Sequence, residues 1–190
     1  MSGIATTTGR QNVAILGIGA ARPKRLVSND EVCEVLDSSD EWIFERSGIR
    51  NRRWISGDES ARSLAAASAE RAIRNSGVPR EKIGVLILAT NSWKTKIPQG
   101  GPTIAYDIGL NGIPAYDIAA GCGGFGYALG VAADTVRAGS AEYVLVVGVE
   151  TLSVVLEPTD RNTAFIFGDG AGSVVVGPSE ENGISPTVWG

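Results

Sequence analysis

The residue whose type and position most clearly suggest chemistry is Cys122, within the stretch YDIAAGCGGFGYAL of residues 116–129. The apolar run before it predicts a buried strand and the pattern after it predicts a helix, so the thiol lies at a sharp strand-to-helix turn. Gly121, Gly123 and Gly124 allow unusual dihedral angles and close backbone approach there. The positive end of the helix dipole favours a thiolate, and its free N–H groups favour an oxyanion. Cys122 is therefore a candidate nucleophile, with a small residue packed at a tight junction as the alternative.

A second group of residues suggests ligand binding. Trp42 and Arg46 stand one helical turn apart and share a face of a predicted helix. An exposed indole beside a guanidinium suits a ligand that carries both a flat ring and phosphates. A core tryptophan with a solvated arginine is the alternative, and the pair alone favours it. Asp160 and Arg161 by themselves indicate only an ion pair in a loop, and Cys33 is predicted to pack as a small buried hydrophobe.

Composition limits the function classes. The chain has 190 residues, of which 43% are hydrophobic and 20% charged, as in a soluble globular domain. Its 17 basic and 21 acidic residues form no basic stripe, so neither nucleic acid nor a membrane is an expected partner. Two cysteines without an apolar leader indicate free thiols and, by default, a cytoplasmic protein. The absence of histidine removes the commonest general base and zinc ligand, so no metal site is expected and any imidazole must come from elsewhere.

The elements that must position these residues alternate between strand and helix. Strands are predicted within residues 13–17, 82–90, 115–120 and 143–150, and two β-rich segments broken by glycines within 164–177. Helices are predicted within residues 28–37, 38–48, 59–77, 102–110 and 123–140. This alternation predicts an α/β fold with a mostly parallel sheet.

Two glycine-rich motifs do not predict nucleotide binding. Gly17 and Gly19 follow an apolar strand, but Arg22 replaces the third glycine of a dinucleotide fingerprint and Pro23 disturbs the helix start. A glycine turn between a strand and a loop is expected there. The stretch FGDGAGS of residues 167–173 lacks the lysine of a phosphate-binding loop, and a tight turn between strands is expected.

Three stretches in order, SSDEWIFERSGIRNRRW, YDIAAGCGGFGYAL and PTDRNTAFIFGDGAGS, resemble signatures of the β-ketoacyl-[acyl-carrier-protein] synthase III family of the thiolase superfamily. The resemblance spans nearly the whole chain. It implies a thiolase-like layered fold in which residues 1–190 are the N-terminal βαβαβαββ half of a condensing enzyme. The family's catalytic histidine and asparagine belong to the C-terminal half, which lies outside this chain.

The resemblance also implies roles for single residues. Cys122 matches the nucleophile that takes an acyl group from coenzyme A. Trp42 and Arg161 match a pair that sandwiches the adenine ring, Arg46 matches an arginine that binds the phosphates, and Ser38 occupies a nearby coenzyme-contact position.

Three further positions are implied to shape the acyl pocket. Leu152 and Phe167 align with residues of its wall, and Ile97 falls where a side chain enters the acyl tunnel of the partner subunit. A bulkier residue is often found at the position of Ile97, so selectivity for acetyl groups alone is not expected.

The function implied is condensation of a Cys122-bound acyl group with malonyl-acyl carrier protein, with decarboxylation, to give 3-oxoacyl-acyl carrier protein. Acyl-CoA is then a substrate and no cofactor is required, while a homodimer completed by the C-terminal half is the expected assembly. Two alternatives remain: an acyltransferase that passes the group to a hydroxyl, an amine or a carrier protein without decarboxylation, and a non-catalytic scaffold that retains the fold.

Overall fold

The centre of the molecule is a five-stranded mixed sheet, seen in a computed structural model that describes residue 9 and residues 11–188. The strand order is β1-β7-β6-β4-β5. The strands are β1 (Val13–Ala21), β4 (Ile83–Ala89), β5 (Ala115–Ile118), β6 (Tyr143–Thr151) and β7 (Asp169–Pro178). Because β7 pairs antiparallel with both β1 and β6, whereas β6, β4 and β5 pair in parallel, β7 alone runs against the other four.

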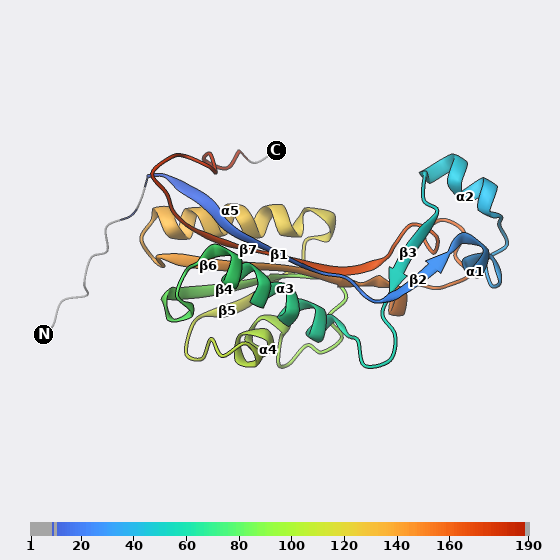
Figure 1. Ribbon diagram of the computed structural model, residues 1–190, viewed down its shortest axis with the longest axis horizontal. Coiled ribbons are helices and arrows are strands. Elements are labelled where there is room, and N and C mark those ends of the chain that lie inside the picture. The colour runs from blue at the N-terminus through green and yellow to red at the C-terminus, as the bar shows by residue number, and fades with distance from the viewer. Residues whose placement is uncertain (1–8, 10, 189–190) are drawn as a thin grey trace, which may run out of the picture.

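Helices cover both faces of this sheet (Figure 1). Helices α3 (Ala61–Ser76) and α4 (Gly100–Asp107) pack on one face, and α5 (Gly124–Arg137) packs on the other. The alanine-rich α3 begins at a capping box and ends at Gly77, whose φ of 68° closes the helix. The run β1, α3, β4, α4, β5, α5, β6, β7 confirms the predicted βαβαβαββ order and the α/β class.

One unit departs from this layered pattern. Between β1 and α3 the chain forms β2 (Arg25–Ser28), α1 (Asn29–Cys33), α2 (Asp40–Ser47) and β3 (Asn51–Trp54). We call residues 25–54 the insert; they project beyond one end of the sheet (Figure 1). The insert has its own small core, formed by Val27, Val32, Leu36 and Ile43 together with Ala164 and Phe165 from the segment before β7. The antiparallel pairing of β2 with β3 was not predicted from the sequence.

The turn predicted at Gly17 and Gly19 is wrong, because both glycines lie within β1. A Cβ atom at Gly17 would lie 2.4 Å from the backbone nitrogen of Ser76, and one at Gly19 would lie 2.1 Å from the backbone oxygen of Ser68. The glycines therefore let α3 lie directly on the strand. The turn predicted for FGDGAGS is also wrong, because residues 169–178 form the single strand β7, paired on both sides.

Helix ends agree with the sequence in most places. Ser39 caps α2 through the N–H of Trp42, and Gly48 ends the helix at a φ of 71°. Ser28 caps α1 through the N–H of Glu31, and Asn29, the first residue of the helix, turns inward and is only 1% exposed. Three single helical turns of 3-10 type complete the elements: η1 (Arg80–Lys82), η2 (Gly121–Gly123) and η3 (Leu152–Val154).

Candidate active site

Cys122 lies in η2, between the end of β5 and the start of α5, as the sequence predicted. It is exposed, and the glycine before it adopts a φ of 55°, a left-handed conformation that residues with a side chain rarely adopt. Helix α5 begins two residues later and no side chain caps its first turn. The thiol therefore stands close to the positive end of a fourteen-residue helix, where developing negative charge is stabilised.

Asn91 holds this turn from the end of β4. Its side-chain oxygen accepts a hydrogen bond from the N–H of Gly121 at 3.2 Å, and its side-chain nitrogen donates to the oxygen of Gly121 at 3.4 Å. Glu150 fixes Asn91 in turn, since its Oε1 accepts from the backbone nitrogen and Nδ2 of Asn91 at 2.8 and 3.0 Å. The other oxygen of Glu150 accepts from the hydroxyl of Ser92. The ends of β4 and β6 thereby determine where the turn that carries Cys122 lies.

A cavity of about 650 Å³ opens beside Cys122. Apolar side chains dominate its wall, and Asn91 and Glu150 also border it. Leu152 and Phe167, both predicted to shape an acyl pocket, line the same cavity as the thiol. Ile97 does not line it and is 90% exposed, so its predicted entry into a partner's tunnel stays a prediction.

The predicted coenzyme-binding residues also lie together. The guanidinium of Arg46 lies 4.7 Å from the ring centre of Trp42, and that of Arg161 lies 5.6 Å from it. Arg161 comes from the segment before β7 and also forms an exposed ion pair with Asp37 at 3.4 Å. The structure thus joins two arginines 115 positions apart around one half-buried indole. The hydroxyl of Ser38 is buried and has no hydrogen-bond partner among the described residues.

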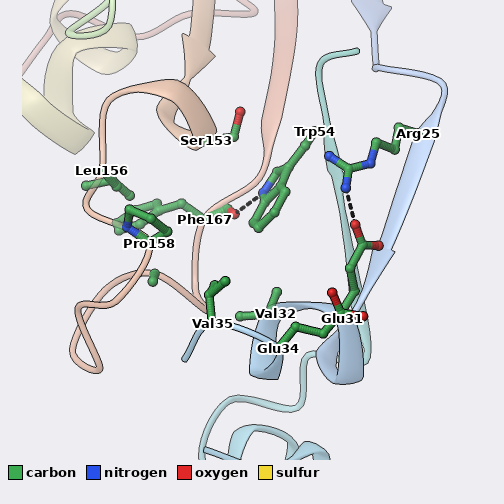
Figure 2. A pocket seen from close by; sticks show the side chains of 11 residues that line it. Arg25, Glu31, Val32, Glu34, Val35, Trp54, Ser153, Leu156, Pro158 and Phe167 are labelled. Carbon is green, nitrogen blue, oxygen red and sulfur yellow. Dashed lines mark hydrogen bonds and ion pairs between the residues drawn. The ribbon is translucent and has the colours of Figure 1, made fainter. Parts of the chain in front are cut away.

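A second, smaller cavity of about 240 Å³ lies between the insert and the segment that follows β6 (Figure 2). The indole nitrogen of Trp54 donates to the backbone oxygen of Phe167 at 3.2 Å. The guanidinium of Arg25 lies 5.7 Å from the ring centre of Trp54 and forms an ion pair with Glu31. Phe167 borders both cavities. Through its bond with Trp54, Phe167 therefore connects the wall of the Cys122 cavity to the insert.

Asp169 makes a further tie between the insert and the sheet. Its carboxylate is 7% exposed and accepts from the backbone nitrogens of Ile55 at 2.8 Å and Ser153 at 3.0 Å, and also from the hydroxyl of Ser153. One buried side chain therefore connects the end of the insert, the start of β7 and the 3-10 turn η3.

The second thiol differs from Cys122. Cys33 packs against the core of the insert, as predicted, but it is half-buried rather than fully buried. Burial raises its pKa, and the nearby carboxylate of Asp30 acts in the same direction. Cys33 is therefore held more firmly as a neutral thiol, which is a poor nucleophile.

Across residue 9 and residues 11–188, no group of three or more metal-ligating side chains of His, Cys, Asp or Glu comes together. Over the same residues, none of the helices has the length and apolar character needed to cross a membrane.

The residues that hold these sites were not found from the sequence. Asn91, Glu150 and Asp169 act through contacts between segments about 15 to 115 positions apart, which no local pattern reveals. Asn91 and Glu150 stand at the ends of parallel strands, and Asp169 stands at the start of β7. Ligand sites of open α/β sheets gather at the carboxyl ends of strands, so this placement could have marked the three residues as part of a site.

Known proteins are similar to this chain in sequence. A family profile described as 3-oxoacyl-[acyl-carrier-protein (ACP)] synthase III matches residues 116–190. Over all 190 residues the chain is 50% identical to a β-ketoacyl-[acyl-carrier-protein] synthase III of Mycobacteroides abscessus, of which it covers 56%. It is also 50% identical to a mycobacterial β-ketoacyl-[acyl-carrier-protein] synthase III of Mycolicibacterium paratuberculosis, of which it covers 57%. The chain thus spans a little over half the length of these relatives.

Solved structures match the fold. The priming β-ketosynthase from the R1128 polyketide biosynthetic pathway has a TM-score of 0.91 and 40% identity, over 97% of this chain and 55% of that chain. The 3-oxoacyl-[acyl-carrier-protein] synthase III from Aquifex aeolicus has a TM-score of 0.86 and 37% identity, over 90% of this chain and 55% of that chain.

The mixed five-stranded sheet, with Cys122 at the end of β5, places the chain first among thiolase-like α/β folds, of which it forms one half. Within that class, its sequence and fold match those of the β-ketoacyl-[acyl-carrier-protein] synthase III family over one half of the family's length.

Proposed function

We propose that this chain supplies the acyl-accepting thiol and the coenzyme A-binding residues of a condensing enzyme. The observation that carries the proposal is the meeting of Cys122, Leu152 and Phe167 at one apolar cavity, at the start of α5. A thiol at a helix N-terminus beside an apolar cavity suits a nucleophile that stores an acyl group as a thioester.

In the first step the thiolate of Cys122 attacks the carbonyl carbon of acyl-CoA. The tetrahedral intermediate collapses, the carbon–sulfur bond to coenzyme A breaks, and the released coenzyme A thiolate takes up a proton. Backbone N–H groups near the first turn of α5 are suited to stabilise the oxyanion. The acyl chain then occupies the cavity bounded by Leu152 and Phe167.

In the second step malonyl-acyl carrier protein loses carbon dioxide, and the resulting carbanion equivalent attacks the acyl thioester. The bond to sulfur breaks, Cys122 is regenerated and 3-oxoacyl-acyl carrier protein leaves. The chain contains no histidine, so the histidine and asparagine expected to stabilise the carbanion would come from a complementary C-terminal half. A homodimer of such completed units is the proposed assembly, with Ile97 reaching the partner's acyl tunnel.

Coenzyme A would bind along the insert. Adenine would enter between Trp42 and Arg161, with Arg46 on the phosphates and Ser38 beside them. The two arginines already lie against the indole, and the ion pair of Arg161 with Asp37 is exposed and therefore weak. Entry of the base then requires only that Arg161 move away from the ring.

Acylation of the complete native protein by radiolabelled acetyl-CoA tests the first step. We expect label on the peptide that contains Cys122, none after Cys122→Ser and full label after Cys33→Ser. Labelled wild type is then mixed with malonyl-acyl carrier protein. Release of carbon dioxide with 3-oxoacyl product supports condensation, whereas transfer without carbon dioxide indicates the acyltransferase. Absence of label from the wild type indicates a scaffold. The mass of the native assembly tests the homodimer and its complementary half.

A further inference from the structure

Arg52, on β3, is a buried cation that the proposed reaction does not use. It is 6% exposed, and burial lowers its pKa below the ordinary range of arginine. None of the ion pairs among the described residues includes it. A buried charge without a counter-charge is costly, so its hydrogen bonds must compensate.

The hydrogen bonds of Arg52 reach two separate segments. Its Nη2 donates to the side-chain oxygen of Asn29 at 2.6 Å and to the backbone oxygen of Phe165 at 3.0 Å. A longer bond runs from Nη1 to the backbone oxygen of Val27 at 3.4 Å. One guanidinium therefore bridges the insert and the segment before β7.

Asn29 connects Arg52 to helix α2. Its side-chain nitrogen donates to the carboxylate of Asp40 at 2.7 Å and to the backbone oxygen of Ile49 at 2.7 Å. Asp40 is the first residue of α2, and Ile49 follows the glycine that ends it. The buried amide of Asn29 thus holds both ends of the short helix that carries Trp42 and Arg46.

Phe165 connects Arg52 to the Trp42 ring and to the segment that carries Arg161. Its ring meets the ring of Trp42 edge-on, with the ring centres 5.3 Å apart and the planes at 80°. Phe165 also lies four positions after Arg161, in the same series of turns. Fixing the backbone oxygen of Phe165 therefore fixes the segment from which Arg161 reaches the indole.

We infer that Arg52 is a positioning residue for nucleotide recognition: it sets the spacing between Trp42 and Arg161 that a planar base must enter. The inference rests on the proposed function, because it assumes a coenzyme A thioester as the acyl donor. A planar guanidinium donates to two acceptors in fixed directions, which the single ammonium of lysine does not reproduce. The role requires no contact between Arg52 and the ligand.

The test compares two acyl donors on the complete native protein. Acetyl-CoA carries the nucleotide, whereas the acetyl thioester of N-acetylcysteamine carries the same reacting group without it. The rate of acylation of Cys122 by each donor is measured from the intact mass. The ratio of the two rates reports nucleotide recognition and is insensitive to the fraction of protein that is folded. We expect Arg52→Met and Arg52→Lys to lower this ratio at least about tenfold, since bonds to a charged donor are lost.

Arg53→Lys is the matched control, because within the described part of the chain the neighbouring arginine donates to the backbone oxygens of Pro23 and Lys24 and to no residue of the coenzyme site. We expect its ratio to stay within about twofold of wild type. Asn29→Ala provides a second variant that retains Arg52 but cuts the link to Asp40, and it should also lower the ratio. Equal ratios in wild type, Arg52→Lys and Asn29→Ala overturn the inference and leave the proposed function standing. A wild type that neither donor acylates overturns both.

Discussion

Asn91 and Gly121 are joined by two hydrogen bonds in opposite directions, one to the backbone nitrogen and one to the backbone oxygen of the glycine. The pair connects the end of β4 to the residue that precedes the thiol. Since Glu150 fixes the orientation of the Asn91 side chain, the position of Cys122 depends on residues from three neighbouring strands.

Loss of this pair should slow the reactions of Cys122. We expect Asn91→Ala to reduce the rate of alkylation by iodoacetamide about threefold to tenfold, because each lost hydrogen bond contributes about 1 kcal/mol to fixing the turn. The rate is measured from the mass of the peptide that contains Cys122. Asn75→Ala is the control, since among residues 11–188 that side chain bonds the backbone oxygen of Ile18, on β1, and not the turn that carries Cys122. An unchanged rate in Asn91→Ala would show that the turn keeps its position without the pair.

The two cysteines should differ in their response to pH. Burial raises the pKa of Cys33, so its thiolate fraction at pH 7 is smaller than that of an ordinary cysteine. We expect Cys33 to be alkylated slowly at pH 7 and faster as the pH rises beyond 9. Cys122 is exposed and should be modified first. Peptide masses after brief iodoacetamide treatment at each pH measure both rates, and earlier modification of Cys33 would contradict the assignment.

Substitution of the β1 glycines should test the contact between β1 and α3. Gly19→Ala places a Cβ atom 2.1 Å from a backbone oxygen of the helix, which neither element can avoid without moving. We expect a loss of about 3 kcal/mol in the free energy of unfolding in urea. Gly126→Ala is the contrasting variant. A Cβ there meets nothing within 4 Å, so replacing this glycine of α5 should stabilise by about 0.5–1 kcal/mol. Equal changes in the free energy of unfolding of the two variants would disprove the close approach of β1 to α3.

Acid should weaken the turn that carries Arg161. Hydrogen bonds from Thr163 and Asn162 lower the pKa of Asp160 in the folded chain. The stability that this carboxylate contributes is fully present above the pKa of an unfolded aspartate, about 3.9, and is lost as the pH falls through the lower folded pKa. We expect the free energy of unfolding to fall less steeply between pH 5 and pH 2 in Asp160→Asn than in wild type. Parallel pH profiles from urea titrations would rule this contribution out.

Local patterns predicted the layered sheet because its strands and helices are long and periodic. The apolar run of residues 82–90 and the alanine-rich helix that ends at Gly77 are such elements. The strand β2 and its partner β3 were missed because each is short and rich in polar residues, whereas the equally short β5 lies in a mostly apolar stretch. Gly17 and Gly19 were misread as a turn, because a glycine that admits a neighbouring helix looks the same in sequence as one that permits a bend.

The candidate site was partly predictable for a similar reason. Cys122 is marked by its own neighbours in sequence, so its place at a strand-to-helix turn could be predicted. The contact of Arg161 with Trp42 joins residues 119 positions apart, and only the resemblance to a known family brought them together. Arg52 was overlooked because nothing local distinguishes a buried arginine from the solvated Arg50 and half-buried Arg53 beside it.

The insert is tied to the segment before β7 by the indole nitrogen of Trp54, and the carboxylate of Asp169 on β7 holds Ile55, the residue that follows the insert. Under the proposed function, the insert and the segment that carries Arg161 recognise coenzyme A, whereas Cys122 and its cavity hold the acyl group. Exchange of both segments between relatives would then change the thioester carrier while the sulfur chemistry stays the same, and a protein engineer would have to graft the two together.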